Sequence, residues 1–382
     1  MAPDPIILPS TGRRRFLQLA AMTGGSLMLP MSLTKAFAAN PVETKLYGLS
    51  AFGELRYPPD FKHFDYVRPG APKGGQFNFS PPNWLFNENP QTFNTLNCFV
   101  LKGDAPPRME MCFDTLLVSA LDEPDSLYCH LAEWVTISAD RNTYTFGLRE
   151  GARFHDGTPI TAADVTFSFL TLKENGHPQL AFPLVELLNA VALDSRTVQI
   201  RYSGNQSAHA VLSIGSLPVL SRAYYTQHPF ESSTLDVPLS SGQYGVGKFE
   251  AGRYIEYRRV PDYWGRNLPT AIGLNNFDVI RIDFFTEREA AFEAFKKGAV
   301  HWHEEFVSKT WATEYHFPAV TEGKVVKAEF PEEKLPTMQA WAVNQRRARF
   351  ADPRVRQAID LCFDFEWTNA KIFYNAYSRS QS

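Results

Sequence analysis

Three stretches of this sequence contain residue types that could do chemistry, and the first is rich in glycine. Residues 242–248 fit the spacing of a phosphate-binding loop, in which backbone amides and a lysine surround a phosphate. Phe249 stands where such a loop needs Ser or Thr, and residues 254–257 alternate as a strand where a helix should begin. Without a helix N-terminus the loop loses the dipole and amides that hold an anion. We therefore predict that this stretch does not hydrolyse nucleotides.

The second stretch contains two histidines, His301 and His303, on either side of Trp302. On a strand their side chains would share one face and could hold a metal ion. Two imidazoles are an incomplete site, and the sequence assigns no third ligand. We therefore predict no metal site, and instead a strand edge beside a cleft, where Glu304 or Glu305 meets a cationic group of a ligand.

The third stretch is His155-Asp156, the best candidate in the chain for the catalytic residues of a secreted peptide hydrolase. The pair directly precedes Gly157, however, and this order is typical of a tight turn. The chain also lacks a nucleophile elbow, an H-E-x-x-H motif and a convincing Cys-His pair. We therefore predict no catalytic residues and keep the hydrolase as an alternative, beside a non-transporting interaction protein.

The elements that must position these residues are clearest between 133 and 169. Residues 134–138 and 143–148 alternate in the manner of an antiparallel hairpin with one buried face. Thr161 followed by Asp164 predicts a capped helix. The expected buried positions of the hairpin and helix are Tyr144, Phe146, Leu148, Val165, Phe169 and Leu172.

Further elements follow from the same rules. We expect residues 47–75 to form a loop and 109–120 to form a helix end or a strand. The remaining expected elements are a first strand at 76–80, a hairpin at 191–202, a strand at 277–284, a helix from Thr286 that ends at Gly298, a crossing strand at 334–344 and a helix capped by Asp352 with Pro353 in its first turn.

Composition excludes several classes of protein. With 382 residues the chain should form two or more domains. Its 38 basic and 41 acidic residues leave no basic field for nucleic acid. No apolar run approaches the roughly 18 residues of a membrane span outside the N-terminus. The cysteines are scattered and lack metal-binding spacing, so buried free thiols are favoured over disulfides: Cys98, Cys112, Cys129 and Cys362.

The N-terminus has the layout of a secretory signal. Residues 13–15 are arginines, followed by Phe16-Leu17, an apolar stretch at 19–33 and a small-residue site at Ala38. The arginines resemble a twin-arginine signal, which exports proteins already folded. We therefore expect cleavage near Ala38 and a periplasmic mature protein.

The stretch from 133 to 169 resembles a signature of the family 5 extracellular solute-binding proteins, the peptide- and nickel-binding components of ABC importers. Residues 258–265 and 350–358 resemble later family segments, and residues 50–53 and 60–66 resemble its YejA-like branch, associated with oligopeptides and the peptide-nucleotide microcin C. The matched positions of the signature are Trp134, Asp140, Tyr144, Phe146, Leu148, Arg149, Gly151, Phe154, Asp156, Gly157, Pro159, Thr161, Ala162, Asp164 and Val165.

The resemblance implies an α/β, periplasmic-binding-protein-like fold of type II (cluster C), with an extra subdomain in lobe I. It divides the chain into a signal (1–38), a lobe I core (39–80 and 222–335), a lobe I subdomain (81–221) and the start of lobe II (336–382). Family members continue for about another domain of roughly 100 to 200 residues. We therefore expect an incomplete lobe II, a C-terminally truncated chain and an exposed apolar surface after the hinge near Pro336.

The family mechanism implies a monomer that binds an oligopeptide between two lobes and delivers it to an inner-membrane permease, without a cofactor and without nucleic acid. Long ordered loops tend to be functional, so the connection 81–107 is expected to line the cleft together with the turn at 241–244. The expected ligand-binding residues are Trp84, Phe93, Asn94, Thr95, Asn97, Ser241, Gln243, Tyr244 and Glu305. Because lobe II is expected to be incomplete, we expect weakened binding.

Overall fold

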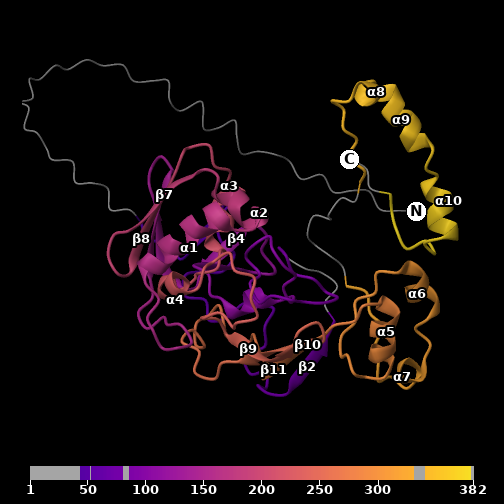
Figure 1. The fold of residues 1–382 in the computed structure, drawn as a ribbon, viewed down its shortest axis with the longest axis horizontal. Helices are drawn as coiled ribbons and strands as arrows, with labels where there is room; N and C mark the ends of the chain where they lie inside the picture. Colours follow the sequence, from indigo (N-terminus) through magenta and orange to yellow (C-terminus); the bar gives the residue numbers. More distant parts are fainter. Residues whose placement is uncertain (1–43, 52, 81–85, 331–339, 380–382) are drawn as a thin grey trace, which may run out of the picture. The chain divides into compact units, whose positions relative to one another are not determined.

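The computed structural model describes residues 44–51, 53–80, 86–330 and 340–379. The expected signal at 1–38, Trp84 and the expected hinge at Pro336 lie outside these ranges. Within them the chain forms three β-sheets and a set of mostly short helices (Figure 1).

One antiparallel sheet has the order β5-β6-β8-β7. It confirms both expected hairpins and joins them, because Tyr144 of β6 pairs with Ile200 of β8. The expected face is buried, with Phe146 and Leu148 each 2 % exposed. The strands are β5 (Ala132–Ile137), β6 (Thr143–Leu148), β7 (Leu187–Ala192) and β8 (Thr197–Tyr202).

Helix α1 (Ala162–Asn175) packs against β7 and β8 of this sheet and confirms the expected capped helix (Figure 1). Asp164 Oδ2 accepts hydrogen bonds from the backbone N–H of Thr161 at 2.9 Å and from its hydroxyl at 2.6 Å. Oδ1 accepts from the backbone N–H of Arg222 at 2.9 Å. The cap therefore fixes both the start of α1 and a segment 58 residues away.

The second sheet has the order β2-β11-β10-β9 and contains the glycine-rich stretch. Strands β2 and β11 are parallel, and the other pairs are antiparallel. Lys248 lies inside β9, so the chain after Gly247 is a strand and offers no helix N-terminus to a phosphate. The strands are β2 (Gln76–Phe79), β9 (Tyr244–Glu250), β10 (Tyr254–Arg259) and β11 (Val279–Asp283).

The third sheet corrects the expectation that residues 47–75 form only a loop. Strand β1 (Gly48–Ser50) pairs antiparallel with β4 (Ser126–Cys129), which also pairs with β3 (Leu117–Ser119). A side chain at Gly48 would place its Cβ 2.4 Å from the carbonyl oxygen of Leu127. The close approach of β4 therefore requires glycine there, and no local pattern shows this pairing.

Two later expectations are confirmed, one is wrong, and one is contradicted in the part that the structure describes. Helix α5 ends before Gly298, which has a φ of 75°, and α9 is capped by Asp352, whose Oδ1 accepts from the N–H of Arg354 at 2.9 Å. The expected strand at 334–344 is not present in its described part, 340–344, and the one at 301–303 is reduced to a single bridge between Phe79 and Trp302.

The short and peripheral helices complete the described elements. They are η1 (Met109–Cys112), α2 (Pro178–Ala181), η2 (Phe182–Leu184), α3 (Ala208–Gly215), α4 (Arg222–Gln227), α5 (Arg288–Lys296), α6 (Ser308–Thr313), α7 (Pro318–Thr321), α8 (Ala348–Ala351), α9 (Pro353–Leu361) and α10 (Phe365–Lys371).

The main core contains three of the four cysteines as free thiols, as expected. Cys98, Cys112 and Cys129 are buried, whereas Cys362 is exposed. Burial raises the pKa of each of the three buried thiols, that of Cys129 to about 12. Among the described helices, none is both long and apolar enough to cross a membrane.

Candidate ligand-binding site

A cleft of about 640 Å³ lies between the long connection and the segment that contains Glu305. One wall is formed by residues 86–91 together with 101, 103 and 104. The other wall is formed by the start of α5 and by residues 303–307. Gln91 Nε2 donates a hydrogen bond to the carbonyl of Thr286 at 3.0 Å, which fixes the two walls to each other. The volume lies within the range of ligand pockets, about 300 to 1,000 Å³.

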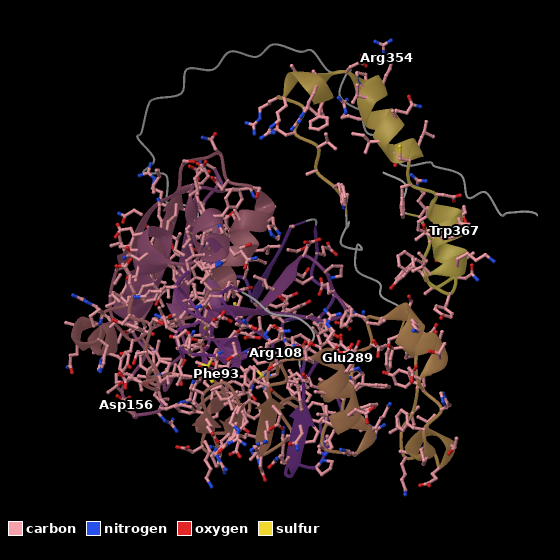
Figure 2. The ribbon with its side chains drawn as sticks, turned by 45° about the vertical axis from the view of Figure 1, so that its right-hand side comes forward. Phe93, Arg108, Asp156, Glu289, Arg354 and Trp367 are labelled. Atoms are coloured by element: carbon pink, nitrogen blue, oxygen red, sulfur yellow. The ribbon has the colours of Figure 1, made fainter. Side chains whose placement is uncertain are left out.

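Carboxylates outnumber cationic groups around this cleft. Arg288 is the only Lys or Arg among the described residues that line it. Glu289, at the first turn of α5, belongs to the acidic set (Figure 2). A ligand that carries an ammonium group would therefore be attracted. The acidic residues of the lining are Glu88, Asp104, Glu287, Glu289, Glu304 and Glu305.

Glu305 is held firmly in this wall. Its side chain is 7 % exposed and accepts hydrogen bonds from Tyr315 Oη at 3.3 Å and from the backbone N–H of Val307 at 2.8 Å. His303 Nε2 lies 3.4 Å from its Oε2. Burial first, and the charge of Glu305 second, raise the pKa of Tyr315, so that phenol remains a donor to the carboxylate.

The two histidines point to different partners. The backbone N–H of Asn78 donates a hydrogen bond to His301 Nδ1 at 3.1 Å, and the His301 ring lies beside Phe77. The ring of His303 stacks on Phe295 with centroids 5.3 Å apart. Across the described ranges, no group of three or more His, Cys, Asp or Glu side chains is placed to hold a metal ion.

The amide and hydroxyl side chains of the long connection bind protein groups, partly in the loop itself and partly in the segment 230–234. Asn94 Oδ1 accepts from the N–H of Asp104 at 2.9 Å, and its Nδ2 donates to that carboxylate at 3.3 Å. Thr95 Oγ1 donates to the carbonyl of Thr234 at 3.1 Å. Asn97 Nδ2 donates to the carbonyl of Phe230 at 2.6 Å. These side chains give the loop its shape, and none of the three lines the cleft.

Phe93 also lies inside the protein. It is 2 % exposed and its ring packs on Phe284, with centroids 5.1 Å apart, and on Phe249 (Figure 2). It therefore fixes the long connection to the core behind the cleft. Trp84 of the same connection lies outside the described residues.

The turn at 241–244 belongs to a buried network that the sequence did not reveal. Ser241 is fully buried, and its hydroxyl accepts from the N–H of Asp114 at 3.1 Å. The Asp114 carboxylate accepts from Tyr263 Oη and from Trp264 Nε1, both at 2.7 Å. No local pattern marks Asp114, because its two side-chain partners lie 149 and 150 residues away.

His130, Tyr244 and Gln243 complete the description of this region. His130 extends the network, with Nε2 2.8 Å from Tyr263 Oη and Nδ1 2.8 Å from the hydroxyl of Thr270. Tyr244 is fully buried and donates to the carbonyl of Phe277 at 2.8 Å, while Gln243 is half-buried. None of Ser241, Gln243 and Tyr244 lines the cleft, so Glu305 is the one described member of the expected set that does.

The side chain of His155 joins the turn at residues 155–157 to the segment 240–242. Its Nε2 lies 2.7 Å from the carbonyl oxygen of Gly242 and therefore carries the proton that it donates there. Nδ1 is then the acceptor for the hydroxyl of Ser240, 3.1 Å away. Ser240 is 4 % exposed, so this Ser-His pair joins two segments and offers no accessible nucleophile.

Comparison with known proteins identifies the family. The model for bacterial extracellular solute-binding proteins, family 5, middle region, matches residues 126–382. The chain belongs to the family 5 solute-binding proteins. Its mixed sheets and helices are the type II periplasmic-binding-protein-like fold that the resemblance implied.

Curated relatives of this family 5 protein place it in the YejA-like branch. The chain is 39 % identical over 339 residues to the uncharacterized protein YejA of Escherichia coli, covering 88 % of this chain and 54 % of that protein. It is 33 % identical over 373 residues to a probable peptide-binding protein YejA of Agrobacterium fabrum, covering 95 % and 59 %. The chain thus spans about half the length of these relatives.

Solved structures share the fold of this family 5 protein at low identity. The oligopeptide-binding protein AppA of Bacillus subtilis, in complex with a nonapeptide, aligns with a TM-score of 0.58 at 19 % identity, covering 81 % of this chain and 57 % of AppA. NikA of Brucella suis, in complex with Fe(III)-EDTA, aligns with a TM-score of 0.59 at 19 % identity, covering 80 % and 58 %. Since those two ligands differ in kind, the fold alone does not specify the ligand.

Proposed function

We propose that this chain is part of the periplasmic substrate-binding component of an ABC importer and that it takes oligopeptides into the acidic cleft. The observation that carries the proposal is the excess of carboxylates around the 640 Å³ cleft, with Glu305 fixed in its wall. Family membership and a relative named as a probable peptide-binding protein support it. In such proteins hinge closure buries the ligand, and the closed form docks on a permease.

The proposal includes a division of labour among the expected site residues. Glu305 attracts the ammonium group of the peptide, and we further propose that Trp84, Asn94 and Gln243 contact parts of the peptide that extend beyond the lining of the cleft. The other members act indirectly, by holding together the protein around the cleft, since their side chains contact other protein groups: Phe93, Thr95, Asn97, Ser241 and Tyr244.

The expected domains remain part of the proposal. Lobe I comprises 39–80 and 222–335 with the subdomain 81–221, and residues 336–382 belong to lobe II. Export through the twin-arginine signal, with cleavage near Ala38, delivers a monomer to the periplasm. The described residues that line the cleft lie between 80 and 310, all within the proposed lobe I. Because the proposed lobe II contributes none of them, we expect this chain alone to bind peptide weakly.

Isothermal titration of the purified chain with mixed tri- to pentapeptides tests the proposal. We expect binding weaker than micromolar, lost when the peptide amino termini are acetylated. Glu305→Gln keeps the shape but removes the charge, and it should weaken binding about 10- to 150-fold, because a hydrogen bond to a charged group contributes about 1.5 to 3 kcal/mol. Glu329→Gln, an exposed carboxylate outside the cleft, should change nothing.

Two results would contradict parts of the proposal. Equal binding by the wild-type and Glu305→Gln chains would remove the acidic cleft as the site of the ammonium group. Submicromolar binding by this chain alone would overturn the expectation of weakened binding.

A further inference from the structure

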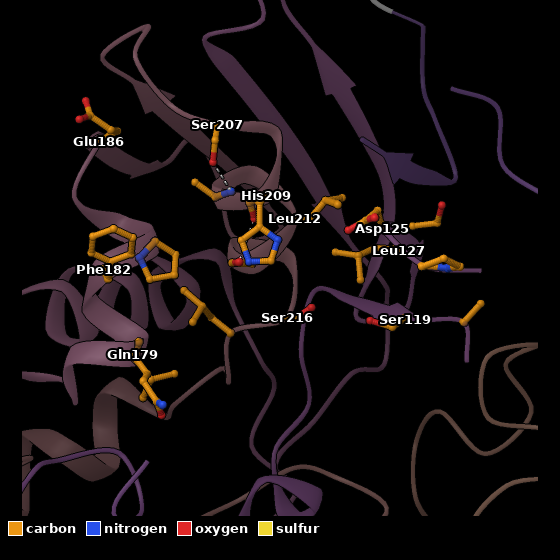
Figure 3. A pocket seen from close by; sticks show the side chains of 18 of the residues that line it. Ser119, Asp125, Leu127, Gln179, Phe182, Glu186, Ser207, His209, Leu212 and Ser216 are labelled. Atoms are coloured by element: carbon orange, nitrogen blue, oxygen red, sulfur yellow. Dashed lines mark hydrogen bonds between the residues drawn. The ribbon is translucent and has the colours of Figure 1, made fainter. Parts of the chain in front are cut away.

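A second and larger hollow has no role in the proposed function. This groove has a volume of about 1310 Å³ and shares no lining residue with the ligand cleft. Its walls are the turn between β3 and β4 (119–127), the segment 178–186 with α2 and η2, and α3 with its flanks (205–217), as Figure 3 shows.

The groove combines a buried apolar floor with exposed apolar side chains. Leu127 and Leu212 lie at the floor and are 3 % and 7 % exposed. Phe182, Leu121 and Val185 line the same groove and are 80 %, 67 % and 60 % exposed. Covering such surface yields about 25 cal/mol per Å² of apolar area, and contiguous exposed apolar surface commonly marks a binding site.

The charges of the groove are of one sign. Asp122, Glu123, Asp125 and Glu186 line it, and the described lining includes no Lys or Arg. Asp122 is paired with Arg56, whose Nη1 lies 3.2 Å from its Oδ2, and Glu123 already accepts hydrogen bonds, one of them from Ser126 Oγ at 2.9 Å. These two carboxylates are therefore partly neutralised by their own neighbours.

Asp125 and Glu186 are the carboxylates left to meet a ligand. They come from different walls: in the view of Figure 3 Glu186 lies on the left above Phe182, Asp125 lies on the right, and Leu212 lies between the two carboxylates. Glu186 accepts a hydrogen bond from Ser203 Oγ on one oxygen, which orients the side chain and leaves its other oxygen for a ligand. The arrangement is complementary to two cations separated by an apolar group.

We propose that this groove is a second peptide-binding site for a short extended peptide whose apolar side chains cover Phe182 and Leu121 and whose Lys or Arg side chains reach Asp125 and Glu186. Its volume exceeds the range of about 300 to 1,000 Å³ that suits drug-sized ligands, and a peptide of several residues fills such a space. Recognition here uses side-chain cations, so it does not require a free amino terminus.

The experiment uses the full chain and two terminally blocked probes, acetyl-Lys-Leu-Phe-Lys-amide and acetyl-Glu-Leu-Phe-Glu-amide. Isothermal titration should show binding of the first and at least tenfold weaker binding of the second. Asp125→Asn with Glu186→Gln should weaken the lysine probe about 2- to 30-fold, since two partly exposed ion pairs contribute about 0.2 to 1 kcal/mol each. Glu231→Gln with Glu366→Gln, two exposed carboxylates outside the groove, is the matched control.

A second pair of variants adds a cation. Phe182→Lys places a positive charge on the groove at a side chain that is already exposed, so folding is preserved while the lysine probe is repelled. Leu188→Lys, at an exposed position on β7 outside the groove, should leave binding unchanged.

Crosslinking separates this site from the acidic cleft. With benzoylphenylalanine in place of phenylalanine, the lysine probe should label segments 119–127, 178–186 or 205–217. Labelling of 86–91 or 303–307, loss of binding with Glu305→Gln alone, or no binding of the lysine probe would each overturn the second site. None of these results bears on whether peptides with free amino termini enter the cleft.

Discussion

Single side chains decide how the walls of the cleft respond to acid, and His177 is the clearest case. Its Nδ1 accepts a hydrogen bond from the N–H of Gln179 at 3.3 Å and so caps α2, and the residue also lines the cleft. Burial lowers the pKa of His177 below its ordinary value of 6.5. A protonated Nδ1 cannot accept a hydrogen bond. The cap of α2 therefore forms only while the His177 ring is neutral.

We expect His177 to contribute stability that is present above pH 6.5 and is lost as the pH falls toward its lower folded-state pKa, because the unfolded chain then binds the extra proton. His177→Asn keeps a capping acceptor without a titrating ring. The variant should therefore lose less thermal stability than the wild type between pH 7 and pH 5, as measured by calorimetry.

His316→Asn, at an exposed histidine in the described part of the chain, provides the comparison and should follow the wild-type curve. If the His177→Asn curve were parallel to the wild-type curve over the whole range, His177 would have no part in the acid response.

At the scale of elements, glycine and tryptophan form a matched pair on the sheet β5-β6-β8-β7. Trp134 of β5 pairs with Gly147 of β6, and a Cβ at Gly147 would lie 2.2 Å from the indole ring. The ammonium group of Lys45 lies 4.2 Å from the centroid of the same ring. The indole of Trp134 thus lies over the backbone of Gly147, and a larger residue at this position would collide with the indole.

Gly147→Ala should destabilise the chain by about 1 to 3 kcal/mol through overpacking, measured by urea unfolding. Combining it with Trp134→Ala should cost less than the sum of the two single changes, because the clash then has no partner. Gly70→Ala, where the new Cβ meets nothing within 4 Å, is the control and should be nearly neutral. If the effects of Gly147→Ala and Trp134→Ala on the free energy of unfolding were additive, the clash between the new Cβ and the indole would be relieved in some other way.

The elements also show which features the sequence could reveal. Both hairpins and the cap of α1 follow from residues close in the chain, such as Thr161 and Asp164, so local patterns predicted them. Strand β1 depends on a partner about 80 residues away, and its three residues carry no periodicity of their own. Pairing over such a distance is decided by the whole fold.

The candidate site was less predictable for a related reason. Asn94, Thr95 and Asn97 are residue types that suit ligand binding, but a long loop must also satisfy its own backbone groups. In the structure Asn94 binds the backbone of the loop, whereas Thr95 and Asn97 bind carbonyl groups of the neighbouring segment 230–234. Residue type indicates what kind of hydrogen bond each side chain can make but does not identify its partner. Glu305 lines the cleft, and its role toward a ligand stays a prediction.

At the scale of the molecule, the segment 340–379 exposes many large apolar side chains. Trp341 is 95 % exposed, Leu361 is 77 % exposed, and Trp367 of α10 is 56 % exposed (Figure 2). An exposed apolar surface after residue 336 was expected. Such surface attracts apolar dyes and other protein molecules.

Replacing Trp341, Leu361 and Trp367 with serine should therefore lower the fluorescence of bound anilinonaphthalene sulfonate and reduce light scattering. The urea midpoint should change little, because exposed apolar groups contribute little to folding. Leu188→Ser, a single exposed leucine on β7, should alter the dye signal only slightly. Unchanged dye binding in the triple variant would mean that the dye binds elsewhere, for example in the groove beside Phe182.

The distribution of the thiols has a practical consequence. All four cysteines fall within the described residues, and Cys362 alone among them is exposed. Maleimide reagents react with accessible thiolates, and burial combined with a raised pKa protects the other three. The native chain therefore has one attachment point for a fluorophore, directly after α9, without any engineering. Slower labelling of Cys98, Cys112 and Cys129 would then time how often the interior opens to solvent.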